Sequence, residues 1–428
     1  MMHTAKKLVS FLNRAHSVYH AVDLLTKELE NAGYTRLQES ESWELASGGK
    51  YYLTRGGSAV MAFRIPESKA ESFMISASHS DRPTFKVKEN GELTGKYTRL
   101  ATEKYGGMLV STWLDRPLSV AGRVTVETET GVENKLLDID RDLLLIPNVA
   151  IHMNRKANEG YAWNPAVDTL PLVGSEKAAG KLWELLEKEA GGKILGHDLY
   201  LYVREKASVW GLEETYISAP ALDDLQCAWG CAQGFLQAKE SRAIPVLCVF
   251  DSEEVGSASR QGAASTMLED VLQRICSSCR LDMRQLLCRS CMVSADNAHA
   301  LHPNHLEYSD ANNAPLPGAG VVLKFNANQS YTTDGLSAAL FRRICGDAGV
   351  PVQTYCNRAD LPGGSTLGRI SLGQVSVLSV DIGLAQLAMH SAYETASVRD
   401  SEYLEKAMTA FYSTSLEGDP ETTLNLAK

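Results

Sequence analysis

Short runs of apolar and β-branched residues, each bounded by turn-forming residues, recur along the chain. Residues 244–250 (IPVLCVF) form the clearest run, and Asp251 and Ser252 follow it directly. Such a run predicts a buried strand, because a strand covered on both faces is apolar throughout. Similar strand-like runs occupy 50–54, 59–63, 73–78, 109–112, 118–126, 135–139, 215–219, 291–295 and 375–382.

Helical spacing of apolar residues separates several of these runs. It predicts helices over 2–33, with an interruption near 17–20, and over 175–189, 223–240 and 336–348. Strands that alternate with helices are typical of the α/β class. We therefore predict a central mixed sheet flanked by helices.

Between residues 90 and 214 the pattern changes to strands separated by polar turns, followed by the apolar stretch LLLIPNVAIHMN at 143–154. A chain of 428 residues is too long for one small domain, so two domains are expected. We predict an α/β domain formed by residues 1–89 and 215–428, interrupted by a β-rich inserted domain at 90–214.

Two adjacent glutamates, Glu253 and Glu254, lie just beyond the predicted strand at 244–250. In open α/β sheets, functional residues gather beyond the carboxyl ends of the strands. Adjacent carboxylates repel each other unless a cation separates their roles. With a bound metal ion, one carboxylate can ligate while its neighbour accepts a proton from water that the ion activates. A Glu-Glu pair also occurs on solvated loops, so by itself it indicates a function only weakly.

Four other predicted strands lead to a histidine or an aspartate: 73–78 to His79, 215–219 to Asp223, 291–295 to Asp296, and 375–382, through a short loop, to His390. With Glu254 they supply two histidines and three carboxylates, a set that suits two divalent cations sharing one carboxylate. Asp81, two residues beyond His79, can orient the His79 imidazole. Each residue alone is also typical of a structural histidine or a capping aspartate. The five together predict a metal site.

Composition supports an ordinary globular protein, with 44% apolar and 22% charged residues. The net charge of −10 argues against nucleic acid as a partner. The chain has no apolar stretch near the ~20 residues of a membrane span, and its first residues lack the apolar centre of a signal peptide. We therefore expect a cytoplasmic protein that does not bind membranes and whose nine cysteines are free thiols.

Two C-x-x-C pairs, Cys276/Cys279 and Cys288/Cys291, raise the alternative of a structural zinc site. The eight residues between the pairs, RLDMRQLL, are fewer than in the usual zinc ribbon and have helical character. The second pair also leads directly into the predicted strand at 291–295, where cysteine is a good small core residue. We expect buried or half-buried thiols.

The motifs around these residues resemble those of the aspartyl aminopeptidase family, dinuclear metallopeptidases whose relatives include vacuolar aminopeptidases. The matching stretches are ASHSDRPTFKVK (77–88), YGGMLVSTWLDRPLSVAGRV (105–124), IPNVAIHMNR (146–155), APALDDL (219–225), FDSEEVGSASRQGA (250–263), MVSADNAHALHPN (292–304), GVVLKFNANQSY (320–331) and QLAMHS (386–391). They follow one another in the family's order. The resemblance implies a metallo-aminopeptidase whose 90–214 insertion is a dimerisation domain.

The resemblance also implies roles for the matched residues. His79 and Asp296 correspond to ligands of one metal ion, Glu254 and His390 to ligands of the other, Asp223 to the bridging carboxylate, and Glu253 to the general base. Two divalent ions per subunit are implied. Zinc suits these ligands best, and cobalt or manganese is also compatible with them. Asp224 stands where relatives commonly have Asn, and it adds negative charge beside the bridge.

Other matched positions lie outside the ligand set. His152 corresponds to a histidine that reaches the active site of a neighbouring subunit, although a core or interface histidine is the alternative. Lys324, Tyr331 and the glycines Gly363 and Gly364 match positions near the substrate. The two glycines are also compatible with turn geometry alone, and Lys324 with a backbone contact.

Assembly and substrate follow from the same resemblance. Family members form dodecamers built from dimers, so we expect a homo-dodecamer acting on peptides with a free amino terminus. The family name suggests amino-terminal Asp or Glu, which the cation of Lys324 would suit. Some relatives prefer neutral or other residues, so the preference stays open.

Two other classes of protein are compatible with parts of the pattern. A different dinuclear hydrolase, such as a deacylase or a carboxypeptidase-like enzyme, would use the same ligands without requiring a free amino terminus. A scaffold protein that kept the fold would be expected to lack a ligand or the base, whereas the chain has all of them.

Overall fold

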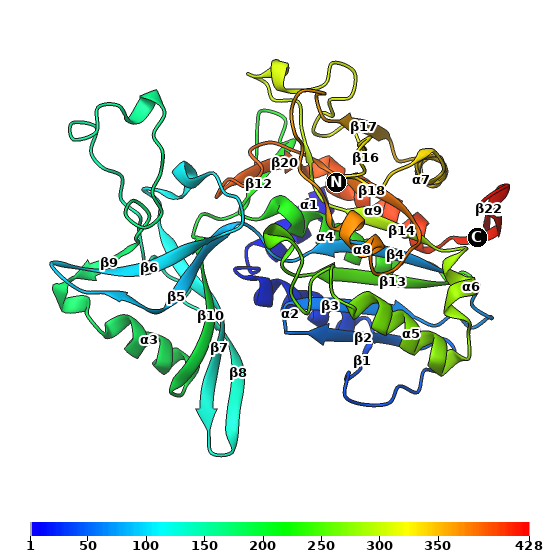
Figure 1. The fold of residues 1–428 in the computed structure, drawn as a ribbon, viewed down its shortest axis with the longest axis horizontal. Coiled ribbons are helices and arrows are strands. Elements are labelled where there is room, and N and C mark those ends of the chain that lie inside the picture. The colour runs from blue at the N-terminus through cyan, green and yellow to red at the C-terminus, as the bar shows by residue number, and fades with distance from the viewer. Residues whose placement is uncertain (1, 428) are drawn as a thin grey trace.

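A computed structural model describes residues 2–427. Two large β-sheets form the framework of this part of the chain (Figure 1). The larger sheet consists of β1 (Thr35–Arg36), β2 (Lys50–Arg55), β3 (Ala59–Arg64), β4 (Ser72–His79), β13 (Ala243–Phe250), β14 (Cys291–Ala295), β16 (Val321–Phe325), β17 (Val352–Cys356) and β18 (Leu378–Gly383). Their order across the sheet is β1-β2-β3-β13-β4-β14-β18-β16-β17. The central strands β13, β4, β14 and β18 run parallel, whereas β3 and β16 pair antiparallel with β13 and β18. The predicted mixed sheet is confirmed.

Helices cover both faces of this sheet. One face carries α1 (Met2–Leu12), α2 (Val18–Asn31), α4 (Leu222–Gln237), α7 (Gly335–Asp347) and α9 (Val398–Tyr412), and the other carries α5 (Met267–Cys279), α6 (Met283–Leu287) and α8 (Leu367–Leu372). Along β13, Leu247 and Val249 join the first core, while Val246 and Cys248 join the second. This alternation is that of a strand buried on both sides, which explains why residues 244–250 are apolar throughout.

The smaller sheet is antiparallel and has six strands. They are β5 (Thr84–Leu93), β6 (Tyr97–Tyr105), β7 (Leu118–Thr128), β8 (Gly131–Asp138), β9 (Leu172–Ser175) and β10 (Ile194–Val203), in the order β8-β7-β10-β5-β6-β9. Helix α3 (Lys181–Ala190) packs on this sheet around a core of its own. This part lies beside the larger sheet and carries long loops (Figure 1). The inserted-domain limits of 90 and 214 stay a prediction.

The remaining elements are short. β11 (Ser208–Trp210), β12 (Tyr216–Ala219) and β20 (Glu394–Ser397) form a three-stranded sheet, and β15 (Ala298–His299) with β19 (Ala385–Gln386) and β21 (Ser415–Asp419) with β22 (Thr423–Ala427) form two pairs. Single 3-10 turns are η1 (Val110–Trp113), η2 (Ala157–Glu159), η3 (Glu176–Ala178), η4 (Glu253–Val255) and η5 (Leu306–Tyr308). Within residues 2–427, no helix has the length and apolar character needed to cross a membrane.

The predicted strand at 109–112 is wrong, because this segment forms η1. The Thr112 hydroxyl donates a hydrogen bond to the Leu109 carbonyl, which closes the turn locally. Trp113, at the end of the turn, is 4% exposed and belongs to the core of the smaller sheet. The apolar character of this segment therefore reflects the burial of Trp113 at the end of a tight turn. It does not indicate a strand.

The cysteines of the two C-x-x-C pairs lie in different environments. Cys276 and Cys291 are buried, Cys279 is half-buried and Cys288 is exposed, and all nine cysteines of the chain are free thiols. Among the described residues, no group of clustered metal-ligand atoms includes a cysteine. Cys276 instead packs in the apolar core beneath α5.

Candidate metal centre

The parallel strands of the larger sheet bring most of the predicted ligands to one edge. His79 is the last residue of β4, Asp296 follows β14, and Glu253 and Glu254 begin the turn that follows β13. The register places Phe250 of β13 opposite His79 of β4, so the two chains leave the sheet at the same level. The carboxyl ends of neighbouring parallel strands converge in this way.

Asp223 and His390 reach the same place by other routes. Asp223 lies in the first turn of α4, after β12, and β12 belongs to the three-stranded sheet instead of the larger one. His390 lies in the loop between β19 and β20. The expectation that five strands end together is therefore correct for the strands before His79, Glu254 and Asp296, while the other two ligands depend on local backbone geometry.

Asp223 lies between the two histidines. Its Oδ1 is 3.6 Å from Nε2 of His79, and its Oδ2 is 3.4 Å from Nε2 of His390. The same His390 nitrogen is 3.4 Å from Oε1 of Glu254. One carboxylate thus offers a separate oxygen to each histidine, which is the arrangement that a bridging ligand requires.

The ligand atoms form overlapping groups in which all members lie within 4.8 Å of one another. The first group contains His79, Asp223, Asp224 and Asp296, the second contains Asp223, Glu254 and His390, and the third contains His79, Glu253 and Glu254. The first two share Asp223. Asp224 is an additional member, and its Oδ2 also accepts the backbone N–H of His79 at 3.2 Å.

The charges of this cluster fit a cation. Asp223 Oδ1, Asp224 Oδ1 and Glu254 Oε1 are buried and have no hydrogen-bond partner among the described residues. Buried carboxylate oxygens without donors are costly, and a bound cation removes that cost. Imidazole and carboxylate groups are the ligands that zinc accepts in catalytic sites. The cluster is therefore able to bind a metal ion.

The pKa values in the cluster reflect this crowding. Burial raises the pKa of Glu253 to about 7, with Asp296 and Asp81 adding to the effect. Burial and the charge of Asp223 raise the pKa of Glu254 well above its usual range. Burial alone would lower the pKa of His79, but the nearby carboxylates of Asp223 and Asp81 outweigh it and raise that pKa.

Asp81 has a wider role than the sequence suggested. Nδ1 of His79 is 3.2 Å from the Asp81 carbonyl oxygen and 3.4 Å from Oδ1 of the same residue, so both the backbone and the side chain of Asp81 lie against the imidazole. Its carboxylate also accepts the backbone N–H groups of Glu253 at 3.0 Å and Glu254 at 3.1 Å. The hydroxyl of Tyr105, which the sequence analysis missed, donates to it at 2.8 Å.

Glu394 was also missed. It is 2% exposed, and its carboxylate accepts the backbone N–H groups of Asp223 and His390. A single glutamate among the small residues of the strand segment 394–397 (ETAS) is the signal that could have identified it, because buried carboxylates in proteins are usually paired or functional.

Lys324 and Tyr331 lie next to Asp296. The Lys324 ammonium is buried, donates to the Asn297 carbonyl at 2.8 Å, and is 3.7 Å from Oδ1 of Asp296. It also lies 5.5 Å from the centre of the buried Tyr331 ring. Lys324 therefore neutralises part of the charge on one predicted ligand.

The two glycines and His152 are exposed. Gly363 and Gly364 are exposed in the loop before α8. A Cβ at Gly363 would collide with the Asn357 side chain, whereas one at Gly364 would meet open space. His152 is exposed on a turn of the part of the chain built on the smaller sheet.

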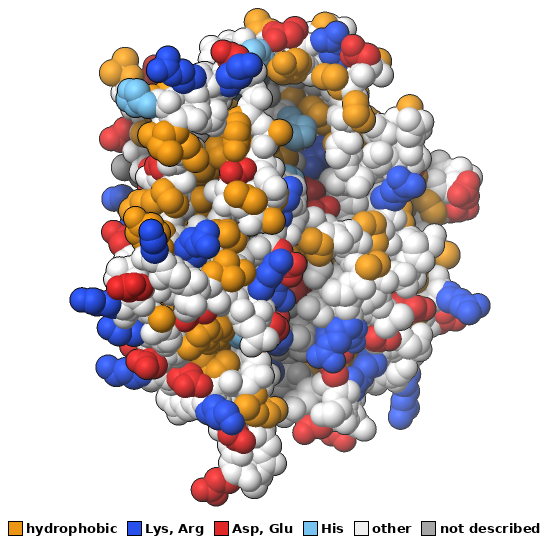
Figure 2. Space-filling model, turned by 60° about the vertical axis from the view of Figure 1, so that its left-hand side comes forward, with side chains coloured by type: hydrophobic (Ala, Val, Ile, Leu, Met, Phe, Trp, Pro, Cys, Tyr) orange, Lys and Arg blue, Asp and Glu red, His pale blue; other side chains and the backbone are white. Residues whose placement is uncertain are grey.

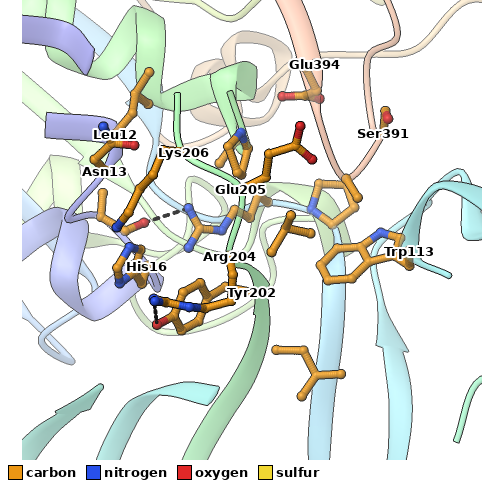
Figure 3. A pocket seen from close by; sticks show the side chains of 18 of the residues that line it. Leu12, Asn13, His16, Trp113, Tyr202, Arg204, Glu205, Lys206, Ser391 and Glu394 are labelled. Atoms are coloured by element: carbon orange, nitrogen blue, oxygen red, sulfur yellow. Dashed lines mark hydrogen bonds between the residues drawn. The ribbon is translucent and has the colours of Figure 1, made fainter. Parts of the chain in front are cut away.

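One face of the molecule is hollowed. Figure 2 shows a depression on one face of the molecule, with histidine and charged side chains visible inside it. A cavity between the end of α1 and strand β10 is lined in part by Asp223 and Glu394 (Figure 3). Its wall includes His16, Tyr202 and Arg204.

Comparisons with known proteins agree with this architecture. A family model described as aminopeptidase I zinc metalloprotease (M18) matches residues 11–412. A relative from Clostridium novyi (strain NT), named "Probable M18 family aminopeptidase 2", is 42% identical over 429 residues, covering 96% of this chain and 98% of the relative. The chain belongs to the M18 family of zinc metallo-aminopeptidases, and the predicted resemblance is confirmed at that level.

Solved structures extend the match to three dimensions. A chain in the "Cryo-EM structure of the Ape4 and Nbr1 complex" superimposes with a TM-score of 0.92 at 34% identity, covering 96% of this chain and 85% of that one. A chain in the "Structure of S. cerevesiae mApe1 dodecamer" superimposes with a TM-score of 0.85 at 25% identity, covering 96% and 97%. The whole fold is therefore that of the family.

Proposed function

We propose that this M18 enzyme removes the amino-terminal residue of peptides at a centre of two divalent cations, with Glu253 as general base. The observation that carries the proposal is the position of Asp223, whose two oxygens face His79 and His390 separately. In this assignment His79 and Asp296 hold one cation, Glu254 and His390 hold the other, and Asp223 bridges them. Zinc is the proposed metal, and cobalt or manganese would fit the same ligands.

When bound, the cations would lower the pKa of water and polarise the scissile carbonyl. The protein's part begins with Glu253, whose carboxylate accepts the proton of the attacking water. Glu253 then returns that proton to the leaving amine, so that one residue serves as base and acid. Asp81 holds the Glu253 backbone in place during both transfers.

A third histidine, His152, would complete the site from a partner subunit. Val149, Ile151 and Met153, which surround His152 in the sequence, are 51%, 48% and 82% exposed. Apolar side chains exposed in this number are typical of an interaction surface. We propose that residues 90–214 form a dimer interface and that His152 reaches the partner's site and stabilises the oxyanion there. We further propose that the dimers assemble into a dodecamer, the state in which the S. cerevesiae mApe1 structure is described.

Subunit mixing tests this arrangement. His152→Ala and Glu253→Gln subunits, each inactive alone, are coexpressed with different tags and purified through both. If His152 acts on its partner, the mixed dimers contain intact sites and regain activity. If verified mixed dimers regain no activity, the role of His152 is refuted. The same holds if the protein is a monomer by light scattering and that monomer is fully active.

The proposed preference is for amino-terminal Asp or Glu. An ammonium group has three donors, of which Lys324 directs one to Asn297 and another toward Asp296. The remaining donor is proposed to bind the substrate's acidic side chain, and burial of Lys324 would strengthen that contact. Glycines Gly363 and Gly364 and the ring of Tyr331 are proposed to line the substrate. The alternative is a family member with neutral preference.

The decisive assay compares Asp-, Glu-, Asn-, Leu- and Lys-anilides with an N-acetylated Asp-anilide. Selective cleavage of the free Asp and Glu substrates supports the proposal. Preference for Leu or Lys would overturn the acidic specificity while keeping the aminopeptidase activity. Cleavage of the acetylated substrate at a similar rate would indicate a different dinuclear hydrolase, such as a deacylase.

A further inference from the structure

Glu394 holds the backbone of two proposed ligands at once. Its Oε2 accepts the N–H of Asp223 at 3.0 Å, and its Oε1 accepts the N–H of His390 at 2.7 Å. The side chain is 2% exposed, so water does not compete for these bonds. A single carboxylate therefore connects the bridging ligand to a ligand of the second cation.

These two ligands need such support more than the others do. His79 is held by strand pairing with Phe250, whereas Asp223 and His390 lie in irregular backbone. Asp223 has φ −84° and ψ 109° inside the first turn of α4, and His390 has φ 64°. The left-handed region is unfavourable for a residue with a Cβ, so surrounding contacts must hold His390 there.

The position of Glu394 is itself well determined. It begins β20 and pairs with Ala219 at the end of β12, four residues before Asp223. The strand thus fixes the Glu394 backbone close to both N–H groups that its side chain accepts. One side of the residue also lines the cavity seen in Figure 3, where its carboxylate is labelled next to Ser391.

Glu394 is not itself placed as a ligand. Within residues 2–427 it belongs to none of the groups of clustered ligand atoms. Both of its oxygens are occupied by backbone donors from Asp223 and His390. Its influence on the centre must therefore act through those two residues.

We propose that Glu394 is a positioning residue that sets the separation of Asp223 and His390 and thereby the affinity for the cation held by Glu254 and His390. The inference rests on the proposed two-cation centre. Residues that orient metal ligands from outside typically affect metal affinity by about 10- to 100-fold when they are replaced.

The test compares Glu394→Gln with a matched control, Asp400→Asn. Asp400 is 0% exposed and also accepts two backbone N–H groups, from Gly318 at 2.6 Å and Gly320 at 3.1 Å. It lies in the first turn of α9 and bonds to neither Asp223 nor His390. Both substitutions replace one carboxylate oxygen with an NH₂ group that cannot accept a hydrogen bond.

Zinc-loaded, full-length proteins are titrated with a competing chelator, and the cobalt-substituted proteins are examined by visible absorption. We expect Glu394→Gln to release one of two ions at about 10- to 100-fold lower chelator concentration and to change the cobalt spectrum, while Asp400→Asn matches the wild type in both measurements. Thermal unfolding of the metal-free proteins should show a similar decrease in midpoint for Glu394→Gln and Asp400→Asn, because each loses one buried hydrogen-bond acceptor.

The inference is overturned if Glu394→Gln releases both ions like the wild type, or if Asp400→Asn weakens binding equally. A wild type that binds a single ion would instead contradict the proposed two-cation centre itself. If Glu394→Gln does not fold, Glu394→Asp takes its place. That variant keeps the charge but is one methylene too short to span both N–H groups, so it should again weaken one ion only, and wild-type release would overturn the inference.

Discussion

The hydroxyl of Tyr105 donates a hydrogen bond to Oδ2 of Asp81 at 2.8 Å. Tyr105 ends β6 of the smaller sheet, whereas Asp81 follows β4 of the larger sheet. The Asp81 carboxylate also accepts the backbone N–H groups of Glu253 and Glu254. The turn that carries the proposed base is therefore connected to the second part of the molecule through one carboxylate.

Replacing Tyr105 with Phe should loosen this connection. A hydrogen bond to a charged acceptor contributes about 1.5–3 kcal/mol, and part of that should appear as lower stability in urea unfolding. Because the change affects the position of Glu253 and leaves the substrate contacts intact, we expect kcat to fall several-fold while KM changes little. Steady-state kinetics with an anilide substrate measures both.

Tyr200→Phe is the control for that experiment. The Tyr200 ring contacts that of Tyr105 with centroids 5.7 Å apart, so the substitution removes a hydroxyl from the same region. Its kcat should stay near that of the wild type. An equal loss of kcat in both variants would show that the hydroxyl–Asp81 bond has no special role.

Glu253→Gln tests the proposed base directly. The amide cannot accept the proton of water, so kcat should fall about 10²- to 10⁴-fold. Glu254 and the other four proposed ligands are unchanged, so the metal content measured by atomic emission should match the wild type. A variant that keeps its metals and turns over at a near-normal rate would refute the role of Glu253.

Asp400 should make stability depend on pH. Burial raises its pKa to about 7, far above the ordinary value of 3.8. Between about pH 4 and 7 the native protein keeps a proton that the unfolded chain has released, so the free energy of unfolding falls as pH rises through this window. Asp400→Asn removes this titration.

The measurement is the difference in unfolding free energy between Asp400→Asn and wild type at pH 5 and at pH 8. The lost hydrogen bond to Gly318 or Gly320 costs the same at both values. The difference should therefore shift in favour of the variant by about 2 kcal/mol at the higher pH. A difference that is the same at both pH values would mean that Asp400 is ionised throughout and would contradict the raised pKa.

Two helical glycines should respond oppositely to alanine. A Cβ at Gly234 in α4 would lie 2.5 Å from Cβ of Met408 in α9, so Gly234→Ala should cost about 1–3 kcal/mol or more through overpacking. At Gly346 in α7 nothing lies within 4 Å, and alanine should stabilise by about 0.5–1 kcal/mol through lower backbone entropy in the unfolded chain. Urea unfolding gives the free energy of unfolding of both variants. A Gly234→Ala variant as stable as the wild type would contradict the prediction.

The rule that functional residues follow the carboxyl ends of strands predicted part of the centre well. The run 244–250 is apolar because both faces of β13 are covered, and this pattern led to Glu253 and Glu254. The same logic located His79 and Asp296 beside them. It could not predict that β12 belongs to another sheet, because an apolar run indicates burial but does not name the strand it pairs with.

The supporting residues were harder to find. Tyr105 and Glu394 act through hydrogen bonds to segments distant in the chain, and such bonds leave no periodic signal. The turn at 110–113 was mistaken for a strand because a few apolar residues suit either structure until their surroundings are known.

The order of apolar and polar residues by itself determined the α/β class, the central strands and the side chains that end them, since burial of each strand requires a local and visible pattern. Tertiary structure alone decided which oxygen of Asp223 faces which histidine, and which carboxylates hold the backbone around them. The reason is that these relationships depend on distances between segments far apart in the chain, and those distances exist only once the separate sheets have packed together.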